Sequence, residues 1–432
     1  MKSLQAGGSP RRSRRGMLAV LIALAVVAAA CGNDDDDGGA AAGGEDTDDT
    51  ATDEGAPSGD PIRIGTSLPL TGDFSEPGQA AENGYMVWES LVNEGDGLLG
   101  RPVELVVRDD ASEQNLAVTD YTNLISQANV DLLLGTFSSF LNLPASAVAE
   151  RNQMVYICPA CGAPDIFERE FQFYFFTQQA VGPDQANLFA EYLTGLPEGE
   201  RPQTAAYVTQ DDPFTAPVIA GLQEQLEAAG VETVLDETYP PDATNFDTLA
   251  DQIRSANPDV LAQGAIFEDG VGLVRSLIRA GFSPSQLFQT TAPSLGDQYA
   301  EGVGQGNTEG IWFATSWDEN LDTPMNVDFV SAYEEMFGGT PPEDAADAFA
   351  SAQVLQAAVE AVGDVEDQQG LADWLHENEV ETILGPLSWD EVGRPQGEFL
   401  LAQWQGDGFE VVLPEELATS DEIINPKPDW QR

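Results

Sequence analysis

Between residues 62 and 291 the sequence alternates between short apolar runs and longer amphipathic stretches. The apolar runs predict strands at 62–70, 103–110, 130–136, 204–210, 231–239, 259–267 and 286–291. The stretches between them predict helices at 77–95, 113–128, 144–152, 215–229, 246–256 and 269–280. Strands this apolar, separated by helices, indicate parallel sheets covered by helices on both faces, which is an α/β fold.

The spacing of apolar residues also indicates how one helix packs and how many domains to expect. Val118, Tyr121, Ile125 and Ala128 recur at helical spacing, so one face of the helix at 113–128 should lie on a sheet. The roughly 370 residues after position 60 exceed one typical hydrophobic core. We therefore predict two α/β lobes.

The N-terminus has the three parts of an export signal. Four arginines between positions 11 and 15 precede an apolar run, 17–30, which ends in three alanines. A transmembrane helix needs about 20 apolar residues, so we predict that residues 1–30 form a signal peptide. An uncleaved N-terminal anchor is the alternative, and both interpretations place the rest of the chain outside the cytoplasm.

The end of this segment carries two export motifs. Residues 13–18 resemble a twin-arginine signal, and Ala28–Cys31 resembles the lipobox of bacterial lipoproteins. The second resemblance implies that Cys31 is diacylated and becomes the mature N-terminus, so the protein would be anchored to the outer face of the cell membrane.

Residues 31–60 are rich in Asp, Glu, Gly, Ala and Thr and contain no basic or aromatic residue. Such a segment cannot bury enough apolar surface to offset the entropy of ordering. About 29 flexible residues reach on the order of 30 Å. We predict a disordered tether, with an acidic interaction tail as the alternative.

The chain is strongly acidic, with 17 Lys and Arg against 74 Asp and Glu and a formal charge of −57. Residues 1–30 contain five of the basic residues and no acid, so their removal changes the charge to −62. A surface of this charge repels nucleic acid and anionic lipid. We expect no nucleic-acid partner, and membrane contact only through the lipid on Cys31.

Few residues could support catalysis or hold a metal. His376 is the only histidine, and we expect it on a solvated helix face. No zinc site or His-dependent nucleophile motif accompanies it. Lys2 and Lys427 are the only lysines, so a phosphate-binding loop is absent, and GVGQG at 302–306 misses the dinucleotide spacing. We therefore predict a protein that is not an enzyme, with no cofactor and no metal; an exported hydrolase with paired carboxylates is the alternative.

Cys158 and Cys161 form a CPAC motif in a chain that we expect to be exported, where a disulfide is chemically permitted. We predict a local structural bridge or two small buried thiols. A redox CxxC is the alternative, but no thioredoxin-like context accompanies the motif.

Six segments together resemble a known family. They are IRIGTSLPLTG, NEGDGLLGRPVELVVRDDAS, VDLLLGTFSS, ICPACGAP, NFDTLADQIRSANPDVL and GPLSWDEVGRPQG. In this order, from Ile62 to Glu410, they are similar to the type I solute-binding proteins of the leucine/isoleucine/valine-binding family. The resemblance implies two doubly wound parallel-sheet lobes joined by a hinge of three chain crossings, near Gly182, Ser316 and Phe399. The first lobe would comprise 61–181 and 316–398, and the second lobe 182–315 and 399–432.

The resemblance also implies a ligand site between the lobes. Ser139 matches a serine that binds the ligand's carboxylate beside a helix N-terminus, and Ser138 is next to it; the alternative is that both only cap the helix. Ala160 lies in the loop of the second carboxylate clamp, although Gly162 stands where the family has threonine. Phe214 stands where the family often has tyrosine.

At other positions the sequence differs from the family, or offers side chains that could also line the pocket. The acid that holds an ammonium group in the family falls near Ala292, and the family's hinge-side aspartate falls near Gly182, so an ammonium would lack its anionic partner. Glu268 or Asp269 could replace it, unless both are solvated acids at a helix start. Four phenylalanines in strand-end loops could line an apolar pocket or belong to the core, namely Phe74, Phe137, Phe140 and Phe267.

The function implied is that of an extracytoplasmic substrate-binding protein of an ABC importer. We expect a monomer that captures a small carboxylate-bearing ligand, an amino acid or a related amide or organic acid, and delivers it to permease subunits. Branched-chain amino acid transport is the family's usual function. A sensory subunit that reports ligand to a membrane receptor is the alternative within the same fold.

Overall fold

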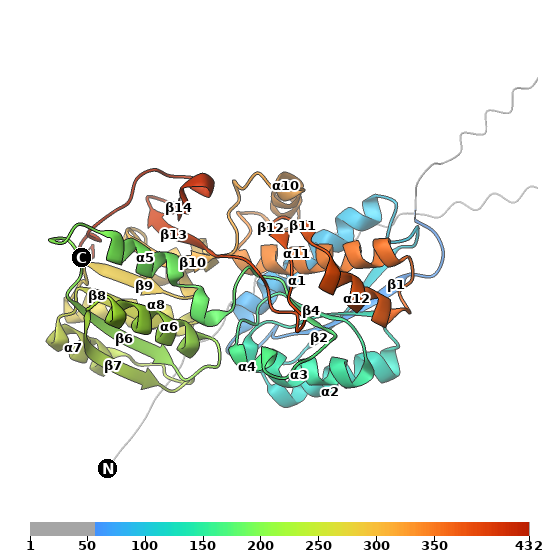
Figure 1. Cartoon of the computed structure of the whole chain (residues 1–432), viewed down its shortest axis with the longest axis horizontal. Coiled ribbons are helices and arrows are strands. Elements are labelled where there is room, and N and C mark those ends of the chain that lie inside the picture. Colours follow the sequence, from blue (N-terminus) through green and yellow to red (C-terminus); the bar gives the residue numbers. More distant parts are fainter. Residues whose placement is uncertain (1–56, 432) are drawn as a thin grey trace, which may run out of the picture. The chain divides into compact units, whose positions relative to one another are not determined.

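The computed structural model describes residues 57–431, which form two β-sheets with helices on both faces of each (Figure 1). The predicted α/β fold class is confirmed. The predicted signal peptide, Cys31 and most of the predicted tether lie outside the described residues. None of the helices within 57–431 is long and apolar enough to cross a membrane.

The first sheet has five parallel strands in the order β2-β1-β3-β4-β5. They are β1 (Ile62–Leu68), β2 (Val103–Asp109), β3 (Leu132–Leu134), β4 (Tyr156–Cys158) and β5 (Tyr174–Phe176). Every residue of β3, β4 and β5 is buried, as a parallel sheet covered on both faces requires.

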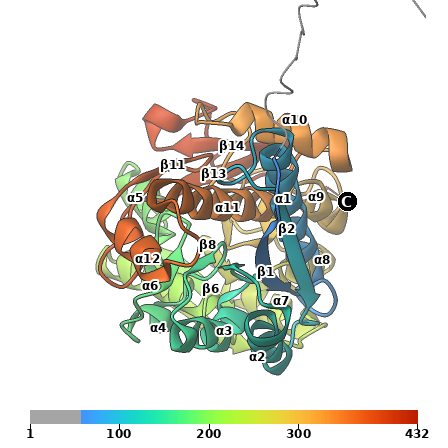
Figure 2. The same cartoon turned by 90° about the vertical axis from the view of Figure 1, so that its right-hand side faces the viewer.

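Two groups of helices cover the first sheet, and Figure 2 shows them on opposite faces. One group packs with the core that contains Ile62 and Trp88: α1 (Ser75–Glu94), α10 (Asn326–Phe337), α11 (Glu343–Val362) and α12 (Gln368–Glu377). The other group is α2 (Gln114–Asn123), α3 (Ser139–Asn152) and α4 (Pro164–Phe167). A small hairpin, β11 (Val380–Thr382) and β12 (Gly385–Leu387), packs with the first group. We call this sheet and its covering elements the first lobe.

The helix predicted over 113–128 packs as expected. It consists of α2 and a π-helical turn, Leu124–Ala128. Tyr121 is fully buried, and Val118, Ile125 and Ala128 pack against the same apolar cluster.

The second sheet has seven strands in the order β14-β13-β10-β9-β8-β6-β7. Five are parallel: β6 (Thr204–Gln210), β7 (Glu232–Tyr239), β8 (Val260–Gly264), β9 (Gln286–Gln289) and β10 (Ile311–Thr315). Two antiparallel strands, β13 (Leu400–Gln405) and β14 (Gly408–Leu413), extend the sheet beyond β10.

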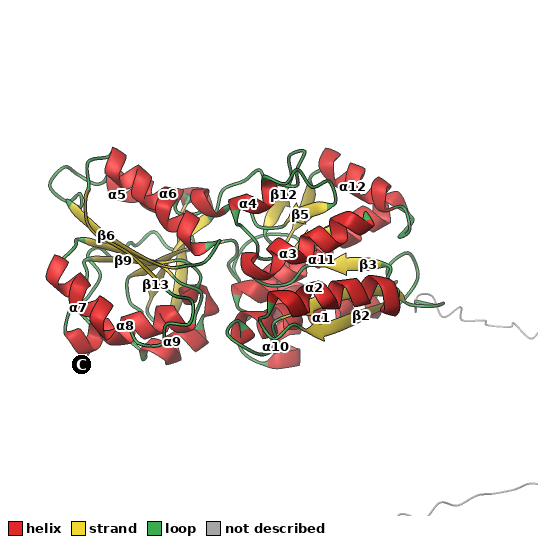
Figure 3. Cartoon of the chain, turned by 90° about the horizontal axis from the view of Figure 1, so that it is seen from below, coloured by secondary structure: helices red, strands yellow, loops and turns green. Residues whose placement is uncertain are grey.

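Helices also cover both faces of the second sheet (Figure 3). One face carries α5 (Asn187–Gly195) and α6 (Thr215–Ala228), and the other carries α7 (Asp247–Ala256), α8 (Glu268–Ala280) and α9 (Asp297–Val303). Short 3₁₀ turns occur at Gly182–Asp184, Ala292–Leu295 and Glu415–Leu417. We call this sheet and its helices the second lobe.

The chain passes between the lobes in three segments: from β5 to β6, from β10 to α10, and from β12 to β13. The precise lobe boundaries at residues 182, 316 and 399 stay predictions.

Two local predictions were wrong. The helix predicted to begin at Pro144 begins at Ser139. Proline favours the first turn of a helix because it lacks an N–H, but here it lies inside α3. The Phe140 carbonyl that it leaves without an intrahelical donor accepts a hydrogen bond from Gln114 Nε2 at 2.7 Å, which explains why the helix tolerates it.

His376 is half-buried rather than on a solvated helix face. Its Nδ1 lies 3.0 Å from the Asp390 carbonyl oxygen and its Nε2 lies 3.1 Å from that of Gln172. The ring also packs on Phe175, with 4.7 Å between centroids. The histidine therefore ties α12 to two loops of the first lobe.

Candidate ligand-binding site

A pocket lies where the carboxyl ends of the strands of both sheets meet. Its lining residues follow β3, β4 and β5 in the first lobe and β6, β8 and β9 in the second. Loops at the carboxyl ends of parallel strands are the usual place for ligands in α/β folds.

The start of α3 contributes the first group of lining residues, Phe137, Ser138 and Ser139. Ser138 caps the helix, because its Oγ accepts a hydrogen bond from Leu141 N at 3.4 Å. Ser139 Oγ instead accepts from Ala163 N at 3.0 Å. The Ser139 hydroxyl hydrogen is therefore left to donate to another group.

The helix start also offers backbone donors. The first N–H groups of a helix have no intrahelical acceptor, and those of Leu141 and Asn142 bond Ser138. This leaves the N–H groups of Ser139 and Phe140, together with the positive end of the helix dipole. Ser138 has a φ of 70°, which is strained for a residue with a side chain and is typical of functional sites.

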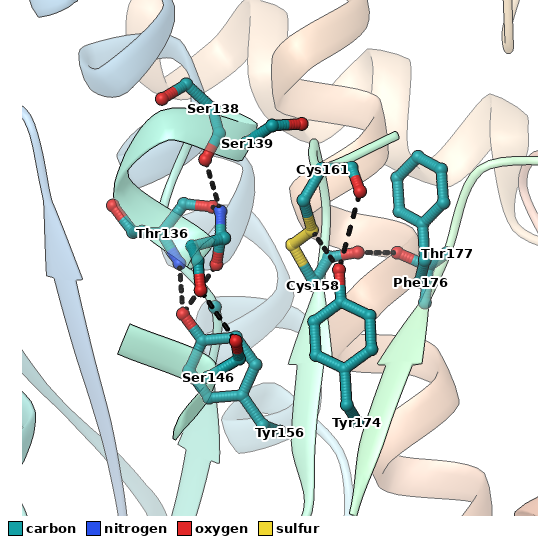
Figure 4. The surroundings of a disulfide bond; sticks show 12 residues. Thr136, Ser138, Ser139, Ser146, Tyr156, Cys158, Cys161, Tyr174, Phe176 and Thr177 are labelled. Atoms are coloured by element: carbon teal, nitrogen blue, oxygen red, sulfur yellow. Dashed lines mark hydrogen bonds between the residues drawn. A yellow bond between two sulfur atoms is a disulfide. The ribbon is translucent and has the colours of Figure 1, made fainter. Parts of the chain in front are cut away.

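The neighbouring loop after β4 contributes Ala160, Cys161 and Gly162. A disulfide joins Cys158 to Cys161 across this loop, and the Tyr174 hydroxyl lies 2.8 Å from Cys161 Sγ. Figure 4 shows Ser138 and Ser139 on the helix beside the disulfide. The disulfide closes this loop on itself. The loop contacts the start of α3 through the Ala163 N–H, which donates to Ser139 Oγ, and through Phe137 and Ala160, which pair as an isolated parallel bridge.

Gly162 lies where the two lobes approach each other. Its carbonyl accepts a hydrogen bond from Gly182 N at 2.7 Å. A Cβ at position 162 would lie 3.2 Å from Gly182 N and 3.3 Å from the Phe214 ring. Glycine is therefore the residue that fits here, and the threonine expected from the family would be crowded.

The second lobe lines the pocket with aromatic and polar side chains. Phe214, at the start of α6, and Phe288, Thr290 and Thr291, at the end of β9, all reach it. Asp212 is buried and its Oδ1 accepts from the backbone N–H groups of Phe214 and Thr215 at 2.8 and 3.0 Å. Burial raises the pKa of Asp212, and these hydrogen bonds oppose the increase.

The start of α11 contributes two buried acids, Glu343 and Asp344. Glu343 Oε1 accepts from the Ser316 backbone N–H at 2.5 Å, and the hydroxyls of Ser316 and Thr315 lie 2.9 and 3.0 Å from it. One turn further along, Asp347 Oδ1 lies 2.6 Å from the same Ser316 hydroxyl, whose single hydrogen can go to only one of the two acids. Burial raises the pKa of all three carboxyl groups, and their mutual repulsion adds to the increase for Asp344 and Asp347.

The structure brings together five of the eight ligand positions predicted from the sequence: Ser138, Ser139, Ala160, Gly162 and Phe214. The other three do not line the pocket. Phe74 packs edge-on against Phe137 and Phe140, with centroids 6.1 and 6.2 Å apart. Phe267 packs against the core of the second lobe, and Glu268 is exposed at the start of α8.

Two further expected positions have structural partners. Asp269 is buried and accepts from the Tyr239 hydroxyl at 2.7 Å and from Ile266 N at 3.0 Å. Ala292 is buried against Gly270, at which a Cβ would lie 2.5 Å from the Ala292 Cβ. Neither position therefore offers an acid to a ligand.

Comparison with known proteins shows the family. A model of the family described as periplasmic binding protein matches residues 61–409. The chain belongs to the type I periplasmic binding protein family. This periplasmic binding protein is 24% identical over 334 residues to Leu/Ile/Val-binding protein homolog 3 of Brucella melitensis, which covers 77% of this chain and 88% of the relative. It is 25% identical over 357 residues to an amino acid binding protein of Pseudomonas aeruginosa, covering 82% and 92% of the two chains.

Solved structures show the same fold. The leucine binding protein LivK of Thermotoga maritima matches this periplasmic binding protein with a TM-score of 0.73 at 20% identity, covering 82% of this chain and 100% of its own. A solute binding protein of an ABC transporter from R. palustris, in complex with benzoate, matches with a TM-score of 0.74 at 23% identity, covering 84% and 99%.

Sequence reasoning missed the acids of the pocket. Asp212 follows β6 in the segment TQDDPF, so the rule that placed Phe214 at a strand end could have found it. Glu343 and Asp344 start a helix after two prolines, a pattern that predicts a helix N-terminus but not a pocket. In the part of the chain that the structure describes, no group of three or more His, Cys, Asp or Glu is placed to hold a metal ion.

Proposed function

We propose that this protein is a lipid-anchored, extracytoplasmic substrate-binding protein of an ABC importer, which closes its two lobes on a small ligand that carries a carboxylate. The observation that carries the proposal is the position of Ser139. It lies at the N-terminus of α3 in a pocket that both lobes line, with its hydroxyl hydrogen available.

The start of α3 is suited to an anion. A carboxylate placed there could accept hydrogen bonds from the Ser139 hydroxyl and from the first backbone N–H groups of the helix, and the helix dipole would favour its charge. The strained backbone of Ser138 supports a role beyond capping. Phe137, Phe214, Phe288 and Phe399 supply apolar contacts for the remainder of the ligand.

Lobe closure is supported by where the lining residues come from. Since the ligand would contact Ser139 in the first lobe and Phe214 and Thr290 in the second, it would stabilise the state in which both are near it. Rotation about three connecting segments would need only a few backbone dihedral angles to change while each lobe moves as a body.

The relatives support the transport role. Curated relatives are named Leu/Ile/Val-binding and amino acid binding proteins. Solved structures of the same fold include a leucine binding protein and complexes with isoleucine or benzoate. We therefore propose amino acids or related carboxylates as ligands and ABC permease subunits as the partner. The lipid anchor rests on the lipobox at Cys31, and loss of membrane fractionation in Cys31→Ala would test it.

The first experiment is isothermal titration calorimetry of the full-length chain against branched-chain and aromatic amino acids, short amides, and aliphatic and aromatic carboxylates. We expect at least one carboxylate-bearing compound to bind. Ser139→Ala should weaken its binding at least about tenfold, because a hydrogen bond to a charged group contributes about 1.5–3 kcal/mol.

Ser146→Ala is the matched control. Ser146 is a buried serine on the same helix whose Oγ donates to the Asn142 carbonyl at 2.7 Å, and it does not line the pocket. Its substitution should leave ligand affinity unchanged. Equal effects of the two substitutions, or binding of short amides in preference to every carboxylate, would refute the role of Ser139. Small-angle scattering with and without ligand should show compaction if the lobes close.

A further inference from the structure

We infer that Asp344 binds an ammonium group of the ligand, so that the ligand is a small zwitterion rather than a simple carboxylate. The inference rests on the proposed function, because it takes the pocket to be the ligand site. It assigns to α11 the recognition of positive charge, which the resemblance to the family placed on the second lobe.

The Asp344 side chain is buried without a complete set of partners. It is 4% exposed, and no donor within residues 57–431 lies within hydrogen-bond distance of its Oδ2. A buried carboxylate oxygen that makes no hydrogen bond is costly. Because Asp344 lines the pocket, a ligand is the group that can supply the missing donor.

The two acids near Asp344, Glu343 and Asp347, both accept hydrogen bonds from other residues of the protein. Glu343 accepts a hydrogen bond from the Ser316 backbone N–H. Asp347 accepts one from the Gln178 side chain, and the single hydrogen of the Ser316 hydroxyl, which is within reach of both acids, goes to one of them. These partners come from the segments after β5 and β10, so the protein itself satisfies both neighbours and leaves Asp344 to the pocket.

Asp344 is the second residue of α11, but a place at a helix start does not explain why its Oδ2 is buried without a hydrogen-bond donor. Helix starts favour acids because of the helix dipole, and Glu343 already occupies the first helical position. The dipole acts equally on an exposed acid in the first turn, such as Asp328 on α10. It gives no reason to bury a carboxylate oxygen and leave it without a donor.

The ionisable residues that line the pocket also favour a ligand with an ammonium group. The lining of the pocket includes three acids, Asp212, Glu343 and Asp344, and none of the described residues that line it is Lys, Arg or His. Burial raises the pKa of all three acids, and the charge of a ligand with only a carboxylate would raise it further. An ammonium group at Asp344 would instead favour the ionised form of its carboxyl group while the ligand's carboxylate lies at the start of α3.

The second lobe offers no competing acid at the expected places. Ala292 is packed against Gly270, and Asp269 is hydrogen-bonded to Tyr239. Asp212 caps α6 through the N–H groups of Phe214 and Thr215. Asp344 is therefore the pocket acid with an oxygen that lacks a donor.

The test compares three molecules of one skeleton, with the full-length chain and calorimetry. The first set is leucine, 4-methylpentanoate, which lacks the amine, and 3-methylbutylamine, which lacks the carboxylate. The second set is phenylalanine, 3-phenylpropanoate and 2-phenylethylamine. Each is titrated into the wild type and into Asp344→Asn, which keeps the shape of the side chain and removes its charge. Asp328→Asn, at an exposed helix start, is the control variant.

We expect the zwitterion of at least one set to bind at least 100-fold more tightly than its desamino analogue. Asp344→Asn should reduce this preference to less than tenfold without weakening the desamino analogue, an effect that a purely structural role would not produce. A thermal melt of Asp344→Asn without ligand should show an unchanged or higher midpoint, which verifies that the variant folds.

The outcomes separate this inference from the proposed function. Equal binding of the zwitterion and the desamino analogue, or a preference that survives in Asp344→Asn, overturns the role of Asp344 and leaves the carboxylate site intact. Binding of the amine as tightly as the zwitterion, lost in Asp344→Asn, supports Asp344 and overturns the carboxylate contact at Ser139. Binding of no member of either set overturns the inference.

Discussion

The free energy of unfolding should depend on pH through one buried acid, Asp110, at the end of β2. Its side chain is fully buried. Oδ1 accepts from Ser112 N at 3.0 Å, and Oδ2 accepts from the hydroxyls of Thr136 and Ser67 at 3.1 and 3.4 Å. Burial raises the pKa of Asp110 to about 6, against these hydrogen bonds and with a smaller contribution from the charge of Asp109.

The sign and size of the effect follow from this pKa. An unperturbed aspartate has a pKa near 3.9, so between about pH 4 and pH 6 the folded chain holds a proton at Asp110 that the unfolded chain has lost. The contribution of Asp110 to stability is therefore full below pH 4 and is lost as the pH rises to about 7. A difference of two pKa units corresponds to about 3 kcal/mol.

The substitution Asp110→Asn removes the titration and keeps the shape. An asparagine amide can donate to the Thr136 and Ser67 hydroxyls, since a hydroxyl also accepts hydrogen bonds. We expect the free energy of unfolding of Asp110→Asn, minus that of the wild type, to rise by about 2 kcal/mol between pH 4 and pH 7, since the unfolded aspartate is already half ionised at pH 4. Urea titrations of both proteins at pH 4, 5, 6 and 7 would measure it, and taking the difference cancels the titration of the other acids.

The adjacent residue provides a control of opposite sign. Asp109 is exposed. Its partial burial raises its pKa, but hydrogen bonds from the N–H groups of Leu70, Thr71 and Ala111 and from the Thr71 hydroxyl together lower it below its usual value. Its contribution to stability is present above pH 4 and lost below it, so the same difference for Asp109→Asn should fall as the pH rises. A difference for Asp110→Asn that stays flat from pH 4 to pH 7 would refute the reasoning, because Asp110 would then be ionised throughout in the folded chain.

Three further predictions concern packing and the pocket. Gly84→Ala should lower the melting temperature by several degrees, because the new Cβ would overlap with the Ala345 carbonyl where α1 crosses α11, and overpacking costs about 1–3 kcal/mol. Gly195→Ala, at the end of α5, should leave the melting temperature unchanged, because nothing lies within 4 Å of the new Cβ. Equal melting temperatures of the Gly84→Ala and Gly195→Ala variants would contradict the reasoning. Gly162→Ala should weaken ligand binding in calorimetry with little change in melting temperature, because its Cβ would crowd the contact between the lobes; unchanged affinity would contradict this. Reduction of the disulfide between Cys158 and Cys161 should cost about 2 kcal/mol of stability, as closure of a short loop predicts, and a melting temperature unaffected by dithiothreitol would be evidence against it.

The regular part of the fold could be predicted because local pattern and tertiary packing agree there. The strand at 204–210 and the helix at 215–228 lie within one residue of their predicted bounds. Prediction failed where a distant side chain changed the outcome. The start of α3 depends on Gln114, thirty residues upstream of Pro144, and no pattern within the helix reveals that partner.

The candidate site could be predicted in part for a similar reason. Ser139, Gly162 and Phe214 follow strands, and the carboxyl ends of parallel strands meet at one edge of a sheet. Phe267 and Glu268 also follow a strand, but the helix that they start turns Glu268 to solvent and packs Phe267 on the core. A residue at a strand end therefore lies near the pocket, but the residue lines the pocket only if its side chain points into it.

Glu343 and Asp344 show why the charge of the pocket could not be derived from its strand-end loops. They enter from a helix that covers the first sheet, and Ser316 and Gln178, in two of the segments that connect the lobes, hold the neighbouring carboxyl groups. The pocket therefore keeps carboxyl groups although position 292 of the second lobe is alanine, because α11 supplies them beside the connecting segments. Recognition of an ammonium by Asp344 would then depend on residues of the connecting segments, about which we propose that the lobes rotate.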